Sequence, residues 1–122
     1  MALRTVRGGK MRTRREALDE MAAALQFPWY FGENWDALDE CMQDLEWLGA
    51  KHVVIAVGDA SELLADAPER DRETFAGVMK RAARERNGGA VLSLHAVLQV
   101  QTKPHSEKLA GWLGPLAPLG GA

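Results

Sequence analysis

Six carboxylates gather in one short stretch of the sequence, YFGENWDALDECMQDLEW, at residues 30–47. The same stretch contains two tryptophans, a tyrosine and the only cysteine of the chain, but no lysine or arginine. Two carboxylates across a cleft can hydrolyse a glycoside, a cluster of oxygen ligands can hold calcium, and an unpaired acidic surface can attract a basic partner. The spacing of these residues distinguishes the three chemistries.

The stretch predicts an amphipathic helix that begins near Asn34. At about 100° per residue, apolar side chains recur on one face. These residues are Trp35, Leu38, Cys41, Met42 and Leu45. A narrow row of acids runs along the opposite side, and Trp47 returns to that side. This row, named here the acidic stripe, consists of Glu33, Asp36, Glu40 and Asp44.

The spacing argues against catalysis and against a metal site. Asp36 and Glu40 lie side by side on one helix, so a substrate could hardly sit between them. A calcium loop of the EF-hand type needs alternating oxygen ligands around a central glycine, and DALDECMQDLEW has helical spacing and no glycine. The three histidines are far apart, and Cys41 falls on the apolar face. We therefore predict no catalytic residue, no metal, no cofactor and no enzymatic activity.

A solvated helix face is the simplest explanation of an acidic stripe. Three features favour a binding surface instead. No base stands at i,i+4 spacing to relieve the repulsion between the acids. Asp44 and Glu46 lie towards the C-terminal end of the helix, where carboxylates are unfavourable. Tyr30 and Trp47 flank the stripe, as aromatic anchors do at interfaces. Such a surface would accelerate the encounter with a cationic partner.

Three short apolar runs alternate with helical segments, and this order favours a parallel sheet. The chain has 122 residues, of which 47% are hydrophobic, and this suits a single domain with one core. The expected strands are residues 3–7, 52–57 and 90–94.

Several helices are expected around this sheet. Thr13 and Glu16 have the spacing of a capping box at the start of the first helix. The acidic helix is the second. The remaining segments are a short helix from Asp59 or Ser61 to Pro68, a longer helix at residues 69–87, a short extra helix at residues 103–113 and a loose tail at residues 114–122.

The composition favours a soluble cytoplasmic protein. One cysteine cannot form an internal disulfide, which suits a reducing compartment. No apolar run has the length of a signal peptide or the ~20 residues of a membrane span. The formal net charge of -2 is small, but the charges are unevenly distributed. The N-terminal segment is basic, residues 16–50 are acidic, and residues 80–86 are basic again. Such charge blocks matter for steering partners.

The stretch FPWYFGENWDALDECMQDL resembles the barstar family, the intracellular inhibitors of secreted bacterial ribonucleases. The segments AAALQFP, HVVIAV and AVLSL follow the order of that family. The resemblance implies a barstar-like α/β fold, in which about four helices pack on a three-stranded parallel sheet. It covers roughly residues 1–95 and is most specific near residues 30–45. We assign residues 1–98 to this domain and residues 99–122 to a C-terminal extension.

The resemblance further implies that the acidic helix and the loop before it plug the basic active site of a ribonuclease, with carboxylates standing in for RNA phosphates. The protein would be an immunity protein or antitoxin that binds one ribonuclease or related toxin, one-to-one. It would be a monomer when free and bind neither nucleic acid nor membrane. The expected partner-binding residues are Tyr30, Gly32, Asn34, Asp36, Asp39, Glu40, Gln43, Asp44 and Trp47.

Two positions depart from the family pattern, and Arg81, together with the added C-terminal segment, leaves an alternative open. Asp39 stands where the type protein has an aromatic contact, and Arg81 falls near a position where an acidic contact is expected. The reversed charge at Arg81 argues for a different ribonuclease or a toxin of related shape. The alternative is a non-catalytic adaptor or regulatory domain of the same fold, which binds a basic protein that is not a nuclease.

Overall fold

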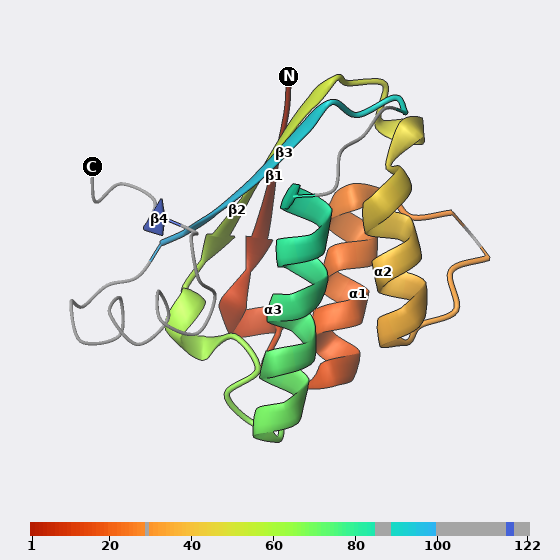
Figure 1. Cartoon of the computed structure of the whole chain (residues 1–122). Coiled ribbons are helices and arrows are strands. Elements are labelled where there is room, and N and C mark those ends of the chain that lie inside the picture. Colours follow the sequence, from red (N-terminus) through yellow and green to blue (C-terminus); the bar gives the residue numbers. More distant parts are fainter. Residues whose placement is uncertain (29, 85–88, 100–116, 119–122) are drawn as a thin grey trace.

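The computed structural model describes residues 1–28, 30–84, 89–99 and 117–118. In this part of the chain, a parallel sheet lies beside a layer of helices (Figure 1). The strands are β1 (Ala2–Arg7), β2 (His52–Gly58), β3 (Ser93–Leu98) and β4 (Ala117–Pro118). The α-helices are α1 (Arg14–Leu25), α2 (Trp35–Asp44) and α3 (Glu69–Arg84).

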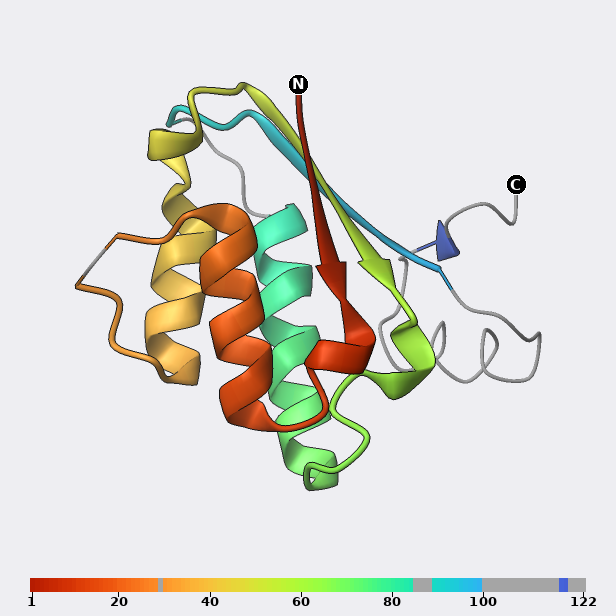
Figure 2. The ribbon, with the colours of Figure 1, turned by 180° about the vertical axis from the view of Figure 1, so that it is seen from behind.

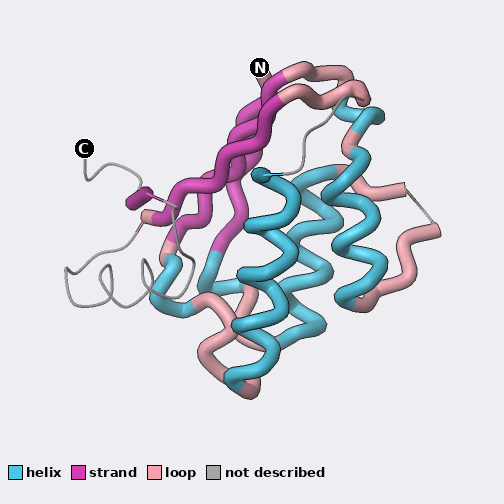
Figure 3. The backbone as a smooth tube through the Cα atoms, viewed as in Figure 1, coloured by secondary structure: helices cyan, strands magenta, loops and turns pink. Residues whose placement is uncertain are grey.

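The strands follow the order β1-β2-β3-β4, and all neighbours pair in parallel. Parallel neighbours need crossover connections. Here α1 and α2 connect β1 to β2, and α3 connects β2 to β3. The two opposite views show these helices on one side of the sheet (Figures 1 and 2), and the separation of strands from helices is plain in Figure 3. The predicted three-stranded parallel sheet is confirmed.

Strand β4 adds two residues to that sheet. Ala117 and Pro118 pair with Val97 and Leu98 of β3, and they lie within the segment that the sequence predicts to be a loose tail. The predicted helix at residues 103–113 lies outside the described residues. The division of the chain at residue 98 stays a prediction.

The core lies between the sheet and the helices. Alternate residues of β1, β2 and β3 point towards the helices, which bury their apolar faces against the sheet or against one another. Burial of apolar surface of this kind is the main force that holds the domain together. Large side chains at its centre include Leu18, Met21, Leu38, Met42, Ile55, Phe75 and Met79.

The starts of the first two helices are confirmed. The Thr13 hydroxyl accepts a hydrogen bond from Glu16 N, and the Glu16 carboxylate accepts one from Thr13 N, which completes the capping box. Asn34 caps α2. Helix α3 begins at Glu69 as expected and is described as far as Arg84, because residues 85–88 lie outside the described part of the chain.

The predicted short helix before Pro68 is wrong. This segment contains one 3₁₀ turn, η3 (Ala60–Glu62), which has no side-chain cap. The amides of Leu64 and Asp66 bond to the carbonyls of Met11 and Arg12, at 2.7 and 2.9 Å. These long-range bonds take donors that a regular helix would need within its own segment.

The third strand lies three residues further along the chain than predicted. It begins at Ser93, and not at residue 90. The amides of Leu92 and Ser93 both donate to the carbonyl of Lys51, at 2.6 and 3.2 Å, just before the pairing with β2 starts. The alternating pattern Leu94, Ala96, Leu98 then faces the core.

Gly8 allows the turn after β1 to pass directly against the end of β2. A Cβ atom at Gly8 would lie 2.2 Å from Asp59 O and 2.7 Å from Gly58 O. Backbone atoms cannot move aside as the end of a flexible side chain can. In contrast, a Cβ atom at Gly9 would meet only the Asp59 carboxylate, at 3.9 Å.

Gly8→Ala is expected to lower the free energy of unfolding by about 1–3 kcal/mol or more, because the two backbones must separate. Gly9→Ala is the matched control and should change the stability much less. Urea unfolding of both variants measures the difference. Equal stabilities of the two variants would contradict the close approach at Gly8.

Glu20 ties α1 to the end of β1. Its Oε2 accepts hydrogen bonds from Arg7 N at 3.0 Å and Arg7 Nε at 2.8 Å, and its Oε1 accepts one from Arg7 Nη2 at 2.9 Å. The hydrogen bonds from the Arg7 side chain lower the pKa of Glu20, against an opposing effect of burial. The ionised carboxylate is therefore the form that the fold favours.

Glu20→Gln is expected to cost stability at neutral pH, and this cost should fade in acid. Because folding lowers the pKa of Glu20, its contribution is complete above the ordinary value of 4.5 and is lost as the pH falls through the folded-state pKa. Urea unfolding of both proteins between pH 7 and pH 3 measures the difference. A cost that stays constant in acid would contradict this linkage.

Candidate partner-binding surface

The turn before α2 is organised by Asn34. Its Oδ1 accepts a hydrogen bond from Ala37 N at 2.8 Å, and its Nδ2 donates to Gly32 O at 3.2 Å. One side chain therefore caps the helix and holds the preceding turn. Glu33, between Gly32 and Asn34, adopts a left-handed backbone conformation with φ 50°.

Tyr30 projects from this region. Its side chain is 66% exposed, which makes it one of the few large apolar residues on the described surface. The rings of Phe27 and Phe31, on either side in the sequence, pack against each other with centroids 4.9 Å apart and also contact the core. Tyr30 is thus exposed next to a segment that is itself held in place.

The acidic stripe is exposed on α2. Asp36, Glu40 and Asp44 stand on successive turns, about 6 Å apart along the axis. Glu33 is exposed too, but it precedes the helix, which begins at Trp35. Within the described part of the chain, no salt bridge involves any residue of the stripe. Its negative charge is therefore not neutralised by a neighbouring base.

Side chains at both ends of α2 fix its position. Near its start, Trp35 Nε1 donates to Asp71 Oδ1 on α3 at 3.1 Å, and the Trp35 ring packs edge-on against Phe75. Just beyond its end, Trp47 Nε1 donates to Leu25 O at the end of α1, at 2.8 Å. Helix α2 is thereby held against both neighbouring helices.

The prediction that Trp47 lies on the acidic side of the helix is wrong. It assumed a helix that continues to residue 47, whereas α2 ends at Asp44 and Leu45 turns the chain with φ 55°. Trp47 lies in the following 3₁₀ turn, η2 (Glu46–Leu48), and its ring packs edge-on against Phe27. Whether Trp47 also contacts a partner stays a prediction.

The other expected residues fall into two groups. Gly32 and Asn34 join Tyr30 at the turn, whereas Asp39 and Gln43 are half-buried on the flank of α2. Asp39 Oδ1 accepts a hydrogen bond from Arg81 Nε on α3 at 3.2 Å. Gly32 needs no special backbone angle, and a Cβ atom there would lie 3.4 Å from Ala37 Cβ.

The sequence did not predict two polar contacts from α3 to α2, made by Asp71 and Arg81. Asp71 and Arg81 are ten positions apart, and both fall within the expected helix at residues 69–87. Helical spacing predicts which face a residue occupies on its own helix, but it does not predict a partner on another helix. The family pattern distinguishes Arg81 as a departure but does not predict its contact with Asp39.

The described residues offer neither a metal site nor an activated nucleophile. Among them, no group of three or more His, Cys, Asp or Glu side chains could hold a metal ion. Burial raises the pKa of the half-buried Cys41 thiol, and the charges of Asp44 and Glu40 raise it further. The thiol is thereby kept in its less nucleophilic protonated form. Also within the described residues, no helix is long and apolar enough to cross a membrane.

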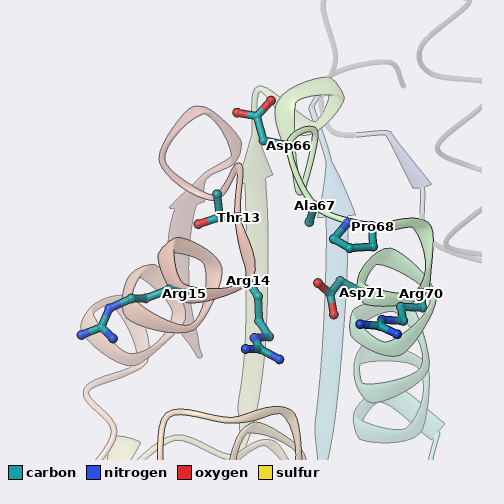
Figure 4. Close-up of a pocket in the computed structure, with 8 residues that line it drawn as sticks. All are labelled: Thr13, Arg14, Arg15, Asp66, Ala67, Pro68, Arg70 and Asp71. Carbon is teal, nitrogen blue, oxygen red and sulfur yellow. The ribbon is translucent and has the colours of Figure 1, made fainter.

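A hollow of about 350 Å³ lies between the starts of α1 and α3. Arg14 on α1 faces Asp71 and Arg70 on α3 across it (Figure 4). Its lining carries both signs of charge, and none of its described lining residues belongs to the expected partner-binding set. Because the lining residue Asp71 bonds to Trp35, the hollow lies near the start of α2 and not on the acidic stripe.

The fold and this surface define an α/β protein that presents a fixed acidic helix next to an exposed tyrosine. A family model described as Barstar (barnase inhibitor) matches residues 1–99. The chain belongs to the barstar family, whose members are inhibitors of ribonucleases rather than enzymes. A search of curated proteins finds no match.

Asp44→Asn is expected to raise the free energy of unfolding by about 0.3–1 kcal/mol. The change removes repulsion from Glu40 one turn away and an unfavourable charge at the C-terminal end of α2. Asparagine keeps the Oδ1 atom, which accepts a hydrogen bond from Glu46 N at 3.3 Å.

Asp36→Asn is the matched control, because Asp36 lies in the first turn, where the helix dipole favours a carboxylate. The loss of that interaction offsets the relief of repulsion. Thermal and urea unfolding compare the two variants. A destabilised Asp44→Asn protein would contradict the view that the stripe is unfavourable to the fold.

Proposed function

We propose that this chain inhibits a bacterial ribonuclease by covering its basic active site with α2 and the turn before it. Membership of the barstar family supports this class of partner. The single observation that carries the proposal for this site is the exposed row Asp36, Glu40 and Asp44, which lacks neutralising partners in the described structure. If this face of α2 contacted only solvent, it would be expected to include some basic residues.

The chemistry of the two surfaces is complementary. A ribonuclease active site must attract the phosphates of RNA, so it carries cationic side chains. Carboxylates at regular intervals on a fixed helix can occupy the positions of those phosphates. Their mutual repulsion is relieved when cations of the enzyme approach, and little order is lost because α2 is already held in place.

The other residues have supporting roles in this proposal. Tyr30 supplies an exposed aromatic anchor at one end of the acidic stripe. Gly32 allows the enzyme to approach the backbone, and Asn34 keeps the turn in its binding shape. The complex contains one inhibitor and one enzyme, and in the producing cell the inhibitor acts as an immunity protein or antitoxin.

The test is affinity capture from lysate and culture medium of the source organism, followed by mass spectrometry and an RNA-cleavage assay. The wild type should capture a small basic nuclease and inhibit it near one-to-one stoichiometry. Asp36→Asn/Glu40→Gln should weaken inhibition by about a hundredfold or more, because cations of the enzyme lose their partners. Inhibition should also weaken with salt, which screens exposed charges over about 10 Å at 0.1 M.

Asp19→Asn/Glu73→Gln is the matched control, because it makes the same charge change at exposed positions of α1 and α3. It should inhibit like the wild type. Equal inhibition by the two double variants would contradict the role of the stripe. Capture of a basic protein that is not a nuclease, lost only in the Asp36/Glu40 variant, would instead support the adaptor alternative.

A further inference from the structure

Asp39 differs from the residues of the acidic stripe because its charge is already paired. Its Oδ1 lies 3.2 Å from Arg81 Nε on the neighbouring helix α3. The side chain of Asp39 is 33% exposed and that of Arg81 is 47% exposed, so the ion pair lies at the solvent boundary of the α2–α3 contact. A partner that covers α2 would meet this pair as well as the stripe.

Arg81 belongs to a row on α3 whose members are exposed except for the half-buried Gly77. The row contains Arg70, Thr74, Gly77, Arg81 and Arg84, at alternating spacings of four and three residues. Gly77 marks where the Arg81 side chain lies, since a Cβ atom there would be 3.9 Å from Arg81 Nη1. This distance is an ordinary van der Waals contact, so the guanidinium of Arg81 lies back along α3 over Gly77 while its Nε reaches Asp39.

The α2–α3 surface is therefore divided by charge. Asp36, Glu40 and Asp44 make the outer side of α2 acidic, whereas Arg81 and Arg84 in the last turn of α3 make the adjoining edge basic. Two cations near the C-terminal end of α3 are also favourable for that helix. Asp39 lies between the two regions and is neutralised from the basic one.

We propose that Arg81 is a specificity-determining residue of the inhibitory surface. Its ion pair withholds the Asp39 carboxylate from the partner and places a guanidinium beside the acidic stripe. The ribonuclease that fits this surface carries an acidic group opposite Arg81, at the edge of its basic active site. This inference rests on the proposed function and names the charge pattern of the partner.

The physical argument is one of selection by repulsion. A ribonuclease with cations on both sides of its active site is attracted by the stripe but is repelled where it approaches Arg81. A ribonuclease with a carboxylate at that edge extends the existing pair of Asp39 and Arg81 into a network across the interface. Specific interfaces commonly combine one attractive and one repulsive element in this way.

The experiment uses barnase, the enzyme in the description of the matched family, as a probe. Its dissociation constant is measured for the wild type and for Arg81→Gln, Asp39→Asn and the double variant Asp39→Asn/Arg81→Gln. Arg14→Gln is the matched control, since Arg14 is an exposed arginine on α1 that makes no ion pair in the described structure. Thermal unfolding verifies that each variant is folded.

Arg81→Gln should bind barnase about two- to fivefold more tightly than the wild type, because a repelling charge is removed and the Asp39 carboxylate is freed. Part of this gain in affinity for barnase should be absent in the double variant. Asp39→Asn alone should not tighten binding. The nuclease captured from the source organism should respond in the opposite sense and bind Arg81→Gln more weakly than the wild type.

Three results would overturn the inference. One is a gain for Arg81→Gln no larger than that for Arg14→Gln. Another is identical binding by Arg81→Gln and the double variant, which would show that Asp39 had not been withheld. The third is binding of the captured nuclease by Arg81→Gln as tight as by the wild type. Failure of the proposed function is distinguishable, because Asp36→Asn/Glu40→Gln would then bind as well as the wild type.

Discussion

Contacts from α1 and α3 hold α2 in place, and the acidic surface depends on them. A ten-residue helix with like charges on successive turns has little stability of its own. Here Leu38 and Met42 are fully buried, and the indoles of Trp35 and Trp47 bond to the neighbouring helices. The free energy from this packing allows the exposed face to carry charges that do not favour the helix.

This arrangement separates the residues that stabilise α2 from those available for binding. The side chain of Asn34 is committed to the turn before the helix, and the two tryptophans are committed to its neighbours. Asp36 and Glu40 have no such role in the described structure, and Asp44 accepts only a hydrogen bond from Glu46 N just beyond the helix. They can therefore change without loss of the fold, which is the situation expected of residues selected for a partner. A barstar-family chain can in this way keep one scaffold and alter its target.

Local features of the sequence predicted most of the fold. Thr13 and Glu16 act within four residues of each other, and the apolar spacing of α2 reflects one helix, so both could be recognised from sequence alone. One prediction failed because of hydrogen bonds to a distant segment. The region after β2 bonds to Met11 and Arg12 and so does not form a helix. The prediction that Trp47 lies on the acidic side failed for a local reason, because the left-handed conformation of Leu45 ends the helix before residue 47.

The pairing of Asp39 with Arg81 shows the same limit at the candidate site. On the helical wheel Asp39 is one more acid next to the stripe, and nothing in its own helix distinguishes it from Asp36. Only the packing of α3 on α2 brings Arg81 to it. The number of carboxylates on a helix is thus a poor measure of the charge that a partner meets. The family defines the fold and the class of target, whereas in the proposed complex individual pairs of this kind would determine which member of that class can fit.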